Sequence, residues 1–196
     1  MSHRMRMSLP SSPFPFSHAV ELTPAHAPLL QRFFDENPAY FLATSGAPAG
    51  PAEALEEITS ELPPETPFTK KWVIGYVGAG SLFAMVNVIT DLLATSIFHI
   101  GTFILATSRH GTGDAQVLNR SIEDWAVANG AVWMRLGVVQ GNLRAERFWA
   151  RQGYLPVRER PGIEMGSRVV TVRNMVKPLG DSDLEEYFAL APRDRP

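Results

Sequence analysis

One stretch near the middle of the chain restricts the possible folds more than any other. Residues 98–106 form an almost continuous apolar run, residues 107–113 form a loop with Gly111 and Gly113, and residues 114–129 repeat apolar side chains at helical spacing. A strand that passes through a glycine loop into a helix presents unpaired backbone N–H groups at the start of the helix. Such a place binds phosphate groups. The stretch therefore predicts a fold that mixes strands with helices and a ligand that carries phosphate.

Two common phosphate loops do not fit this stretch. A Walker loop ends in Gly-Lys-Ser/Thr, whereas Gly113 is followed by Asp114 and Ala115. A dinucleotide fingerprint needs a third glycine three residues after the second, where this chain has Gln116. The phosphate loop therefore belongs to another class.

Two motifs resemble those of the GCN5-related N-acetyltransferases. The loop Ser108-Arg109-His110-Gly111-Thr112-Gly113 is similar to the family's coenzyme A loop, Gln/Arg-x-x-Gly-x-Gly/Ala, and departs from it at Ser108. About thirty residues downstream, Asn142-x-x-Ala145-x-x-Phe148-Trp149-x-x-x-Gly153-Tyr154 resembles the family's second motif, with Trp149 where the family usually has tyrosine. The resemblance covers residues 70–178 and reaches the N-terminal third only through the order of elements.

The resemblance implies an α/β (α+β) fold with a mixed, mostly antiparallel sheet of six or seven strands flanked by about four helices. We expect residues 1–17 to be a disordered leader, residues 18–179 to form a single domain, and residues 180–196 to be a tail. The tail carries Leu184, Tyr187 and Phe188 at helical spacing, so it packs as a helix on the domain or on a second subunit of a homodimer.

The local patterns place the elements within this domain. Pro24 suits the first turn of a helix capped by Thr23, and the pair Asn37-Pro38 ends that helix. The expected helices are 24–37, 52–62, 113–129 and 142–152, and the expected strands are 18–22, 72–77, 82–89, 98–106, 132–139, 155–160 and 168–176. A turn at Pro161-Gly162 and a short loop at Gly166-Ser167 are expected between the last two strands. Because a helix separates strands 98–106 and 132–139, these two are expected to be parallel.

Residues 72–90 contain no charged side chain, so a membrane span is an alternative to strands. Three glycines within the run and its β-branched residues favour two strands joined by a turn at residues 78–80. We therefore expect no membrane insertion.

Composition excludes several classes of function. A net charge of −2 and 45% hydrophobic residues describe an ordinary globular protein without the basic surface of a nucleic-acid binder. The chain has no cysteine, which excludes thiolate metal sites and an acyl-cysteine intermediate, and fits a cytoplasmic protein. We expect no metal cofactor.

The resemblance implies that acetyl coenzyme A (acetyl-CoA) is the acyl donor. In the family, the strand before the loop separates from its parallel neighbour and pairs with the pantetheine arm, and the loop binds the diphosphate. Gly101, a residue suited to a bulge, is consistent with such a separation. The expected donor-binding residues are therefore Phe103, Ile104, Leu105, Arg109, His110, Gly111, Thr112, Gly113, Asp114, Ala115, Asn142, Phe148 and Trp149. We expect the carboxylate of Asp114 to point away from the ligand, and Asn142 to serve as a helix cap, as a ligand of the arm, or both.

The catalytic residues are expected from the same resemblance. His99 occupies the strand position where some relatives carry a histidine in the acceptor site, so it is the expected base, ahead of Asp91 and Glu36. The alternative is a buried neutral histidine. Because Trp149 replaces the usual tyrosine acid, Tyr154 is the expected proton donor, with Tyr40, a water or unassisted departure of the thiolate as alternatives.

The expected function is direct transfer of an acetyl group to the primary amine of a small or amino-acid-like acceptor. Phe34, Asn37 and Tyr40, in the aromatic-rich N-terminal helices, are the expected acceptor-binding residues. A catalytically silent module that binds or senses acyl-CoA is the alternative, favoured by Ser108 and Trp149. The sequence leaves the identity of the acceptor and the acyl-chain length open.

Overall fold

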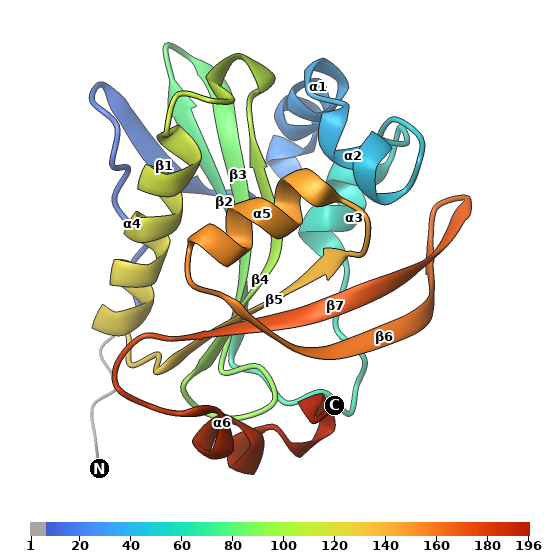
Figure 1. Cartoon of the computed structure of the whole chain (residues 1–196). Coiled ribbons are helices and arrows are strands. Elements are labelled where there is room, and N and C mark those ends of the chain that lie inside the picture. Colours follow the sequence, from blue (N-terminus) through green and yellow to red (C-terminus); the bar gives the residue numbers. More distant parts are fainter. Residues whose placement is uncertain (1–6) are drawn as a thin grey trace.

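One seven-stranded sheet forms the centre of the molecule in the computed structural model, which describes residues 7–196. The strand order is β1-β2-β3-β4-β5-β7-β6, and only the pair β4–β5 is parallel (Figure 1). The strands are β1 (Ser17–Glu21), β2 (Lys70–Gly78), β3 (Ser81–Thr90), β4 (Ile97–Leu105), β5 (Trp133–Val139), β6 (Leu155–Met165) and β7 (Arg168–Pro178). The prediction of a mixed, mostly antiparallel sheet is confirmed.

Residues 7–196 contain six α-helices rather than about four. They are α1 (Ala27–Glu36), α2 (Ala39–Thr44), α3 (Glu53–Thr59), α4 (Asp114–Ala128), α5 (Leu143–Arg151) and α6 (Leu184–Leu190). The sequence analysis did not predict α2. Pro38 ends α1, as expected, but it also begins a new helix as the N-cap of α2. The second predicted helix, α3, is shorter than expected.

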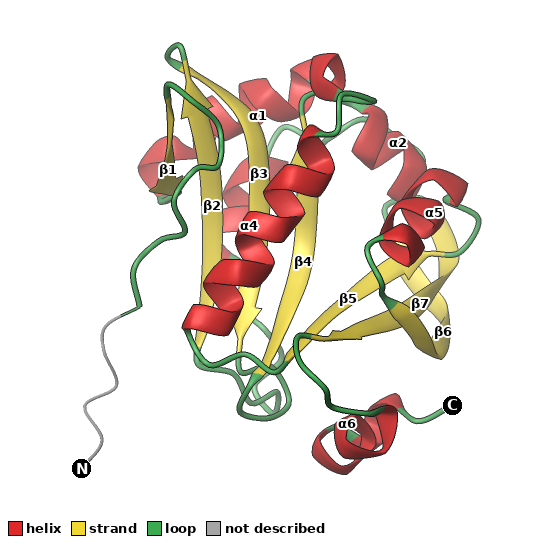
Figure 2. Cartoon of the chain, turned by 60° about the vertical axis from the view of Figure 1, so that its left-hand side comes forward, coloured by secondary structure: helices red, strands yellow, loops and turns green. Residues whose placement is uncertain are grey.

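The helices cover both faces of the sheet (Figure 2). One face packs against α4, where Leu118 and Ile122 join the apolar side chains of β2 and β3. The other face packs against α1 through Leu30, Phe33 and Phe34. At the far end, α6 packs on the domain itself, where the Tyr187 ring lies 5.1 Å from that of Trp133.

The uncharged run at residues 72–90 forms the two central strands β2 and β3, which are covered on both faces. Their turn places Ala79 and Gly80 at positive φ angles of 51° and 78°, as a tight hairpin requires. Within residues 7–196, no helix has both the length and the apolar character needed to cross a membrane.

The last hairpin is longer than the sequence predicted. β6 continues through Pro161-Gly162, where a turn was expected, and ends at Met165. The chain reverses only at Gly166-Ser167, the expected short loop, and β7 begins at Arg168 as predicted. Pro161 is tolerated because β6 is an edge strand, and the register shift between Arg160 and Ile163 marks a bulge in which Gly162 has a φ of 73°.

The segment before β1 lies on the domain rather than being disordered from residue 7 onward. The Trp125 indole donates to the Ser8 carbonyl at 2.7 Å, and Phe14 packs edge-on against Phe83 at 5.5 Å. Residues 1–6 of the expected leader lie outside the described residues.

Candidate functional site

The parallel strands β4 and β5 separate after a short contact. They pair only from Ile97–Trp133 to Ile100–Leu136, and then β4 continues beside β3 while β5 continues beside β7. Figure 2 shows the two strands diverging into a V. Within the described chain, the edge of β4 after Ile100 that faces β5 therefore has no strand partner.

A bulge at Gly101 lies where the separation begins. Asn87 pairs with Thr102 and Val88 pairs with Ile100, so Gly101 is the extra residue of β4. The bulge shifts the alternation of side chains. Ile100 before it and Phe103 after it consequently both belong to the core beneath α4 and α5, although they are three residues apart.

The V opens into a cavity of about 510 Å³. Its walls come from α2, β4, the loop before α4, β5, α5 and the β6–β7 hairpin. The predicted site residues among its lining are Asn37, Tyr40, Phe103, Ile104, Leu105, His110, Gly111, Gly113, Ala115, Asn142, Phe148 and Trp149. Most of the predicted donor-binding residues therefore surround one hollow.

The glycine loop closes one end of this cavity. Gly111 and Gly113 have φ angles of 79° and 92°, a conformation that side chains rarely adopt, and a Cβ added to either would meet no atom within 4 Å. Gly113 is also the N-cap of α4, and it provides no side chain to cap the first turn. The positive end of the helix dipole is thus open toward the cavity.

The predicted loop residues Arg109, Thr112 and Asp114 do not line the cavity with their side chains. Arg109 pairs with Asp114 at 2.8 Å and stacks over the Phe83 ring at 4.1 Å. Thr112 donates to the Arg109 carbonyl at 2.8 Å. As expected, the Asp114 carboxylate points away from the cavity. These three residues can therefore contact a ligand in the cavity only through their backbone.

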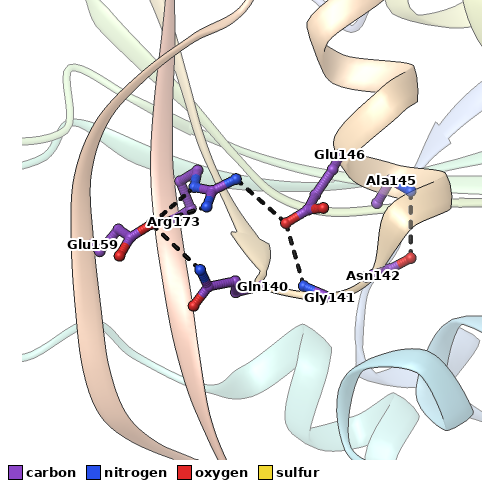
Figure 3. Close-up of polar contacts among 7 residues, drawn as sticks. All are labelled: Gln140, Gly141, Asn142, Ala145, Glu146, Glu159 and Arg173. Carbon is purple, nitrogen blue, oxygen red and sulfur yellow. Dashed lines mark hydrogen bonds and ion pairs between the residues drawn. The ribbon is translucent and has the colours of Figure 1, made fainter.

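Asn142 begins α5 and lines the cavity at the same time. Its side chain accepts from Ala145 N at 3.3 Å, while Glu146 accepts from Gly141 N at 3.2 Å (Figure 3). Arg173 on β7 joins Glu146 to Glu159, at 3.4 and 2.9 Å. These contacts hold the β5–α5 loop and the hairpin in fixed positions beside the cavity.

Three aromatic rings form the wall between the two arms of the V. Phe103 lies 6.0 Å from Phe148 and 5.3 Å from Trp149. Tyr154, the expected proton donor, is not part of this lining. It lies behind Trp149 at 5.1 Å, is 2% exposed, and burial raises the pKa of its hydroxyl. The position of Tyr154 does not suit a proton donor to the cavity.

His110 lines the cavity, and its ring Nε2 lies 2.9 Å from the Leu105 carbonyl oxygen. Burial lowers the pKa of His110, so the ring tends toward the neutral form, which can donate this hydrogen bond. His110 therefore ties the loop to the end of β4.

His99, the expected base, lies on β4 but is not among the residues that line the cavity. Its Nδ1 is 3.1 Å from Nη1 of Arg135, which in turn binds Asp194. Burial, together with the nearby Arg135 guanidinium, lowers the pKa of His99 to about 3. The alternative of a buried neutral histidine describes this residue, and neither its place nor its pKa suits a general base near neutral pH.

The next carboxylates considered are also elsewhere. Asp91 accepts from the Thr69 hydroxyl at 2.6 Å and from Ser96 N at 2.9 Å, and so holds the turn between β3 and β4. Glu36 is exposed at the end of α1. Neither lines the cavity.

The N-terminal helices contribute two of the three expected acceptor-binding residues. Asn37 lines the cavity and accepts from Thr107 N at 2.7 Å, which joins the end of α1 to the loop. Tyr40 also lines it, and burial with the nearby Glu57 carboxylate raises the pKa of its hydroxyl to about 12. Phe34 is instead a core residue, 1% exposed beneath the sheet.

Glu57 on α3 is the functional candidate that the sequence did not reveal. Its carboxylate accepts from Asn87 Nδ2 at 2.6 Å and from the Thr102 hydroxyl at 3.2 Å. Tyr40 lies close enough to Thr102 and Glu57 for both to act on the pKa of its hydroxyl. A carboxylate is thereby connected to the cavity at the Gly101 bulge, where the strands separate.

No protein-family model matches the sequence, and no curated protein matches it either. Solved structures do match, with low sequence identity. An acetyltransferase from Thermus thermophilus is 19% identical with a TM-score of 0.63, covering 83% of this chain and 96% of its own. Spermidine N-acetyltransferase from Vibrio cholerae, in complex with CoA and spermine, is 15% identical with a TM-score of 0.63 over 85% of this chain and 97% of its own.

A third matching structure belongs to a named family. The acetyltransferase of the GNAT family from Streptococcus pneumoniae is 16% identical with a TM-score of 0.57, covering 84% of this chain and 99% of its own. The chain has the fold of the GCN5-related N-acetyltransferases.

Proposed function

We propose that this protein transfers an acetyl group from acetyl-CoA directly to the primary amine of a small-molecule or amino-acid-like acceptor. The observation that carries the proposal is the shared cavity of the unpaired β4 edge and the Gly111–Gly113 loop. A diphosphate and an arm rich in amide groups need these two features side by side.

The chain's residues fit the donor along its length. The backbone at Gly111, Gly113 and Ala115 faces the cavity at the helix N-terminus and suits the diphosphate. The free edge of β4 at Phe103 and Leu105 offers N–H and C=O groups to an amide-containing arm, as a neighbouring strand would. Arg144 and Arg151, which line the cavity from α5, suit the remaining phosphate charge.

A proton must leave the acceptor before its nitrogen can attack, because an alkylammonium has no free electron pair. Tyr40 lines the cavity beside Thr102, and the Thr102 hydroxyl donates to the Glu57 carboxylate at 3.2 Å, so a short proton path can lead from the cavity to Glu57. We assign Glu57 as the final proton acceptor and Tyr40 as the hydroxyl that meets the amine. This assignment replaces His99.

When bound, acetyl-CoA supplies the thioester carbon that the amine attacks, with cleavage of the carbon–sulfur bond. A simple thiol has a pKa of about 8 to 9, so the thiolate can depart without a strong acid. This suits a site in which Trp149 takes the usual tyrosine position and Tyr154 is buried behind it.

Calorimetry and turnover test the proposal together. Acetyl-CoA should release heat on binding and raise the melting temperature, since a ligand at a hundredfold its Kd stabilises a fold by about 2.7 kcal/mol. A panel of primary amines should then release free thiol. Absence of both heat and thermal protection would overturn the proposal.

The replacement of the usual tyrosine by Trp149 favours one second candidate, a silent module that binds acyl-CoA. Binding of acetyl-CoA with no thiol release from any amine would support this second candidate.

A further inference from the structure

The acceptor half of the cavity is apolar. It lies between α2 and the β6–β7 hairpin, and its lining there is Tyr40, Ala43, Thr44, Gly137, Met165 and Val172. The Thr44 hydroxyl donates its proton to the Tyr40 carbonyl at 3.0 Å, so its oxygen can only accept. Among these side chains, the Tyr40 and Thr44 hydroxyls are therefore the two polar groups that can accept from an ammonium group.

Negative charge reaches this half from α3, where Glu57 acts on Tyr40 more strongly than Glu53 does. Within residues 7–196, no Asp or Glu lines the cavity. Glu57 stands directly behind it, hydrogen-bonded to Thr102 at the bulge. One carboxylate can balance one ammonium group, and a second ammonium in an apolar wall would be desolvated without a partner.

A cation stands at the hairpin tip beside this half. Arg168 pairs with Met165, which lines the cavity, and its side chain lies against Gly46 of the α2–α3 loop. A cation in this place repels an acceptor that carries several positive charges.

The same contacts close the cavity over its acceptor half. A Cβ added to Gly166 would lie 2.9 Å from the Ser45 Cβ, and one added to Gly46 would lie 2.7 Å from the Arg168 Cδ. The hairpin tip thus touches the α2–α3 loop, on the side where Figure 1 shows the hairpin extending toward α2 and α3. An extended peptide running between them would have to break this contact.

We infer that the acceptor is a small primary amine with one positive charge and an apolar body, rather than a polyamine or the N-terminus of a peptide. This inference rests on the proposed function and specifies its acceptor. The ammonium group points to Tyr40 and Glu57, and the apolar body packs against Met165 and Val172.

Three acceptors of different chemistry test it in one assay. With acetyl-CoA and the full chain, thiol release is measured for 2-phenylethylamine, spermidine and a pentapeptide with N-terminal alanine. We expect kcat/KM for 2-phenylethylamine to be at least about tenfold higher than for either other amine, because the apolar wall rewards the ring.

Reversing the charge of Arg168 tests the role of this cation directly. Arg168→Glu should raise kcat/KM for spermidine several-fold and leave the value for 2-phenylethylamine nearly unchanged. Arg120→Glu, at an exposed position on α4, changes net charge by the same amount and should alter neither value.

The outcomes separate this inference from the proposed function. Faster turnover of spermidine or the peptide would overturn the acceptor class and leave acetyl transfer standing. Binding of acetyl-CoA without turnover of 2-phenylethylamine would also overturn it. Failure to bind acetyl-CoA would instead overturn the proposed function.

Discussion

Arg135 holds Asp194 by two parallel hydrogen bonds, from Nε at 2.6 Å and from Nη2 at 3.0 Å, in a place where both side chains are almost fully buried. Asp194 also accepts from the Tyr187 hydroxyl at 2.6 Å and from Asn174 Nδ2 at 3.0 Å. The Arg135 guanidinium and these donors lower the pKa of the Asp194 carboxyl despite its burial. The segment after α6 is thereby fixed to the root of the V.

Replacing Asp194 should therefore destabilise the fold strongly. Asp194→Ala leaves the Arg135 guanidinium buried without its partner, which typically costs about 3–5 kcal/mol. For a chain of this size we expect a fall in melting temperature of roughly 6 °C or more. The exposed Asp181→Ala is the control and should change the free energy of unfolding by less than about 0.5 kcal/mol. Equal melting temperatures for the two variants would contradict the structural role of Asp194.

His99 should make the fold sensitive to acid. Its pKa in the folded state is about 3, below the ordinary 6.5, so the unfolded chain binds this proton first as the pH falls. Stability is complete above about pH 6.5 and decreases as the pH falls from there toward 3, with a loss of about 2 kcal/mol at pH 5. Urea unfolding at pH 7 and pH 5 measures the difference.

The matched variant is His99→Asn, whose amide oxygen can take the place of Nδ1 beside Arg135. It should lose about 2 kcal/mol less than the native chain between the two pH values. An unchanged pH slope in His99→Asn would show that His99 is protonated in the folded state.

The parts of the site that follow from short-range patterns were predictable. The glycine loop, the helix after it and the cap at Asn142 are each specified within a few residues, because positive φ angles and capping side chains act locally. The separation of β4 and β5 was expected from the family resemblance, together with a bulge suited to Gly101, and the structure has both features.

The assignment of the base depended on information that the sequence does not contain. The family resemblance gave His99 a strand position but not the neighbours of its ring. In the fold, β5 brings Arg135 beside His99, and Arg135 also binds Asp194 from the last segment of the described chain. Glu57 was missed for a related reason. It meets Asn87 and Thr102 only after α3 packs across two strands that lie 30 and 45 residues away in the chain.

Gly113 should matter more for the binding of acetyl-CoA than for the stability of the fold. Gly113→Ala forces alanine into a φ of 92°, at a cost of about 1–2 kcal/mol, and places a methyl group where the backbone faces the cavity. We expect calorimetry to give a Kd for acetyl-CoA about tenfold higher. Gly80→Ala is a matched control, because Gly80 has a φ of 78° in a distant turn and equally open surroundings. It should lose similar stability with no change in Kd, and an equal loss of affinity in both variants would argue against the loop as the donor site.

Glu57 should be needed for the chemical step and not for donor binding. Glu57→Gln keeps hydrogen-bonding groups for Asn87 and Thr102 but removes the negative charge that accepts the proton. Since a positioned base contributes about 10²–10⁴-fold, kcat should fall by at least about a hundredfold while KM for acetyl-CoA stays within threefold. The neighbouring Glu56→Gln, at an exposed position on α3, should leave kcat unchanged.

Tyr40→Phe should lower kcat in the same way as Glu57→Gln. Because the two residues would act in one proton path, the double variant should be little slower than Glu57→Gln alone. Losses that multiply in the double variant would mean that Tyr40 and Glu57 act independently, and a native kcat in Glu57→Gln would remove Glu57 from the mechanism.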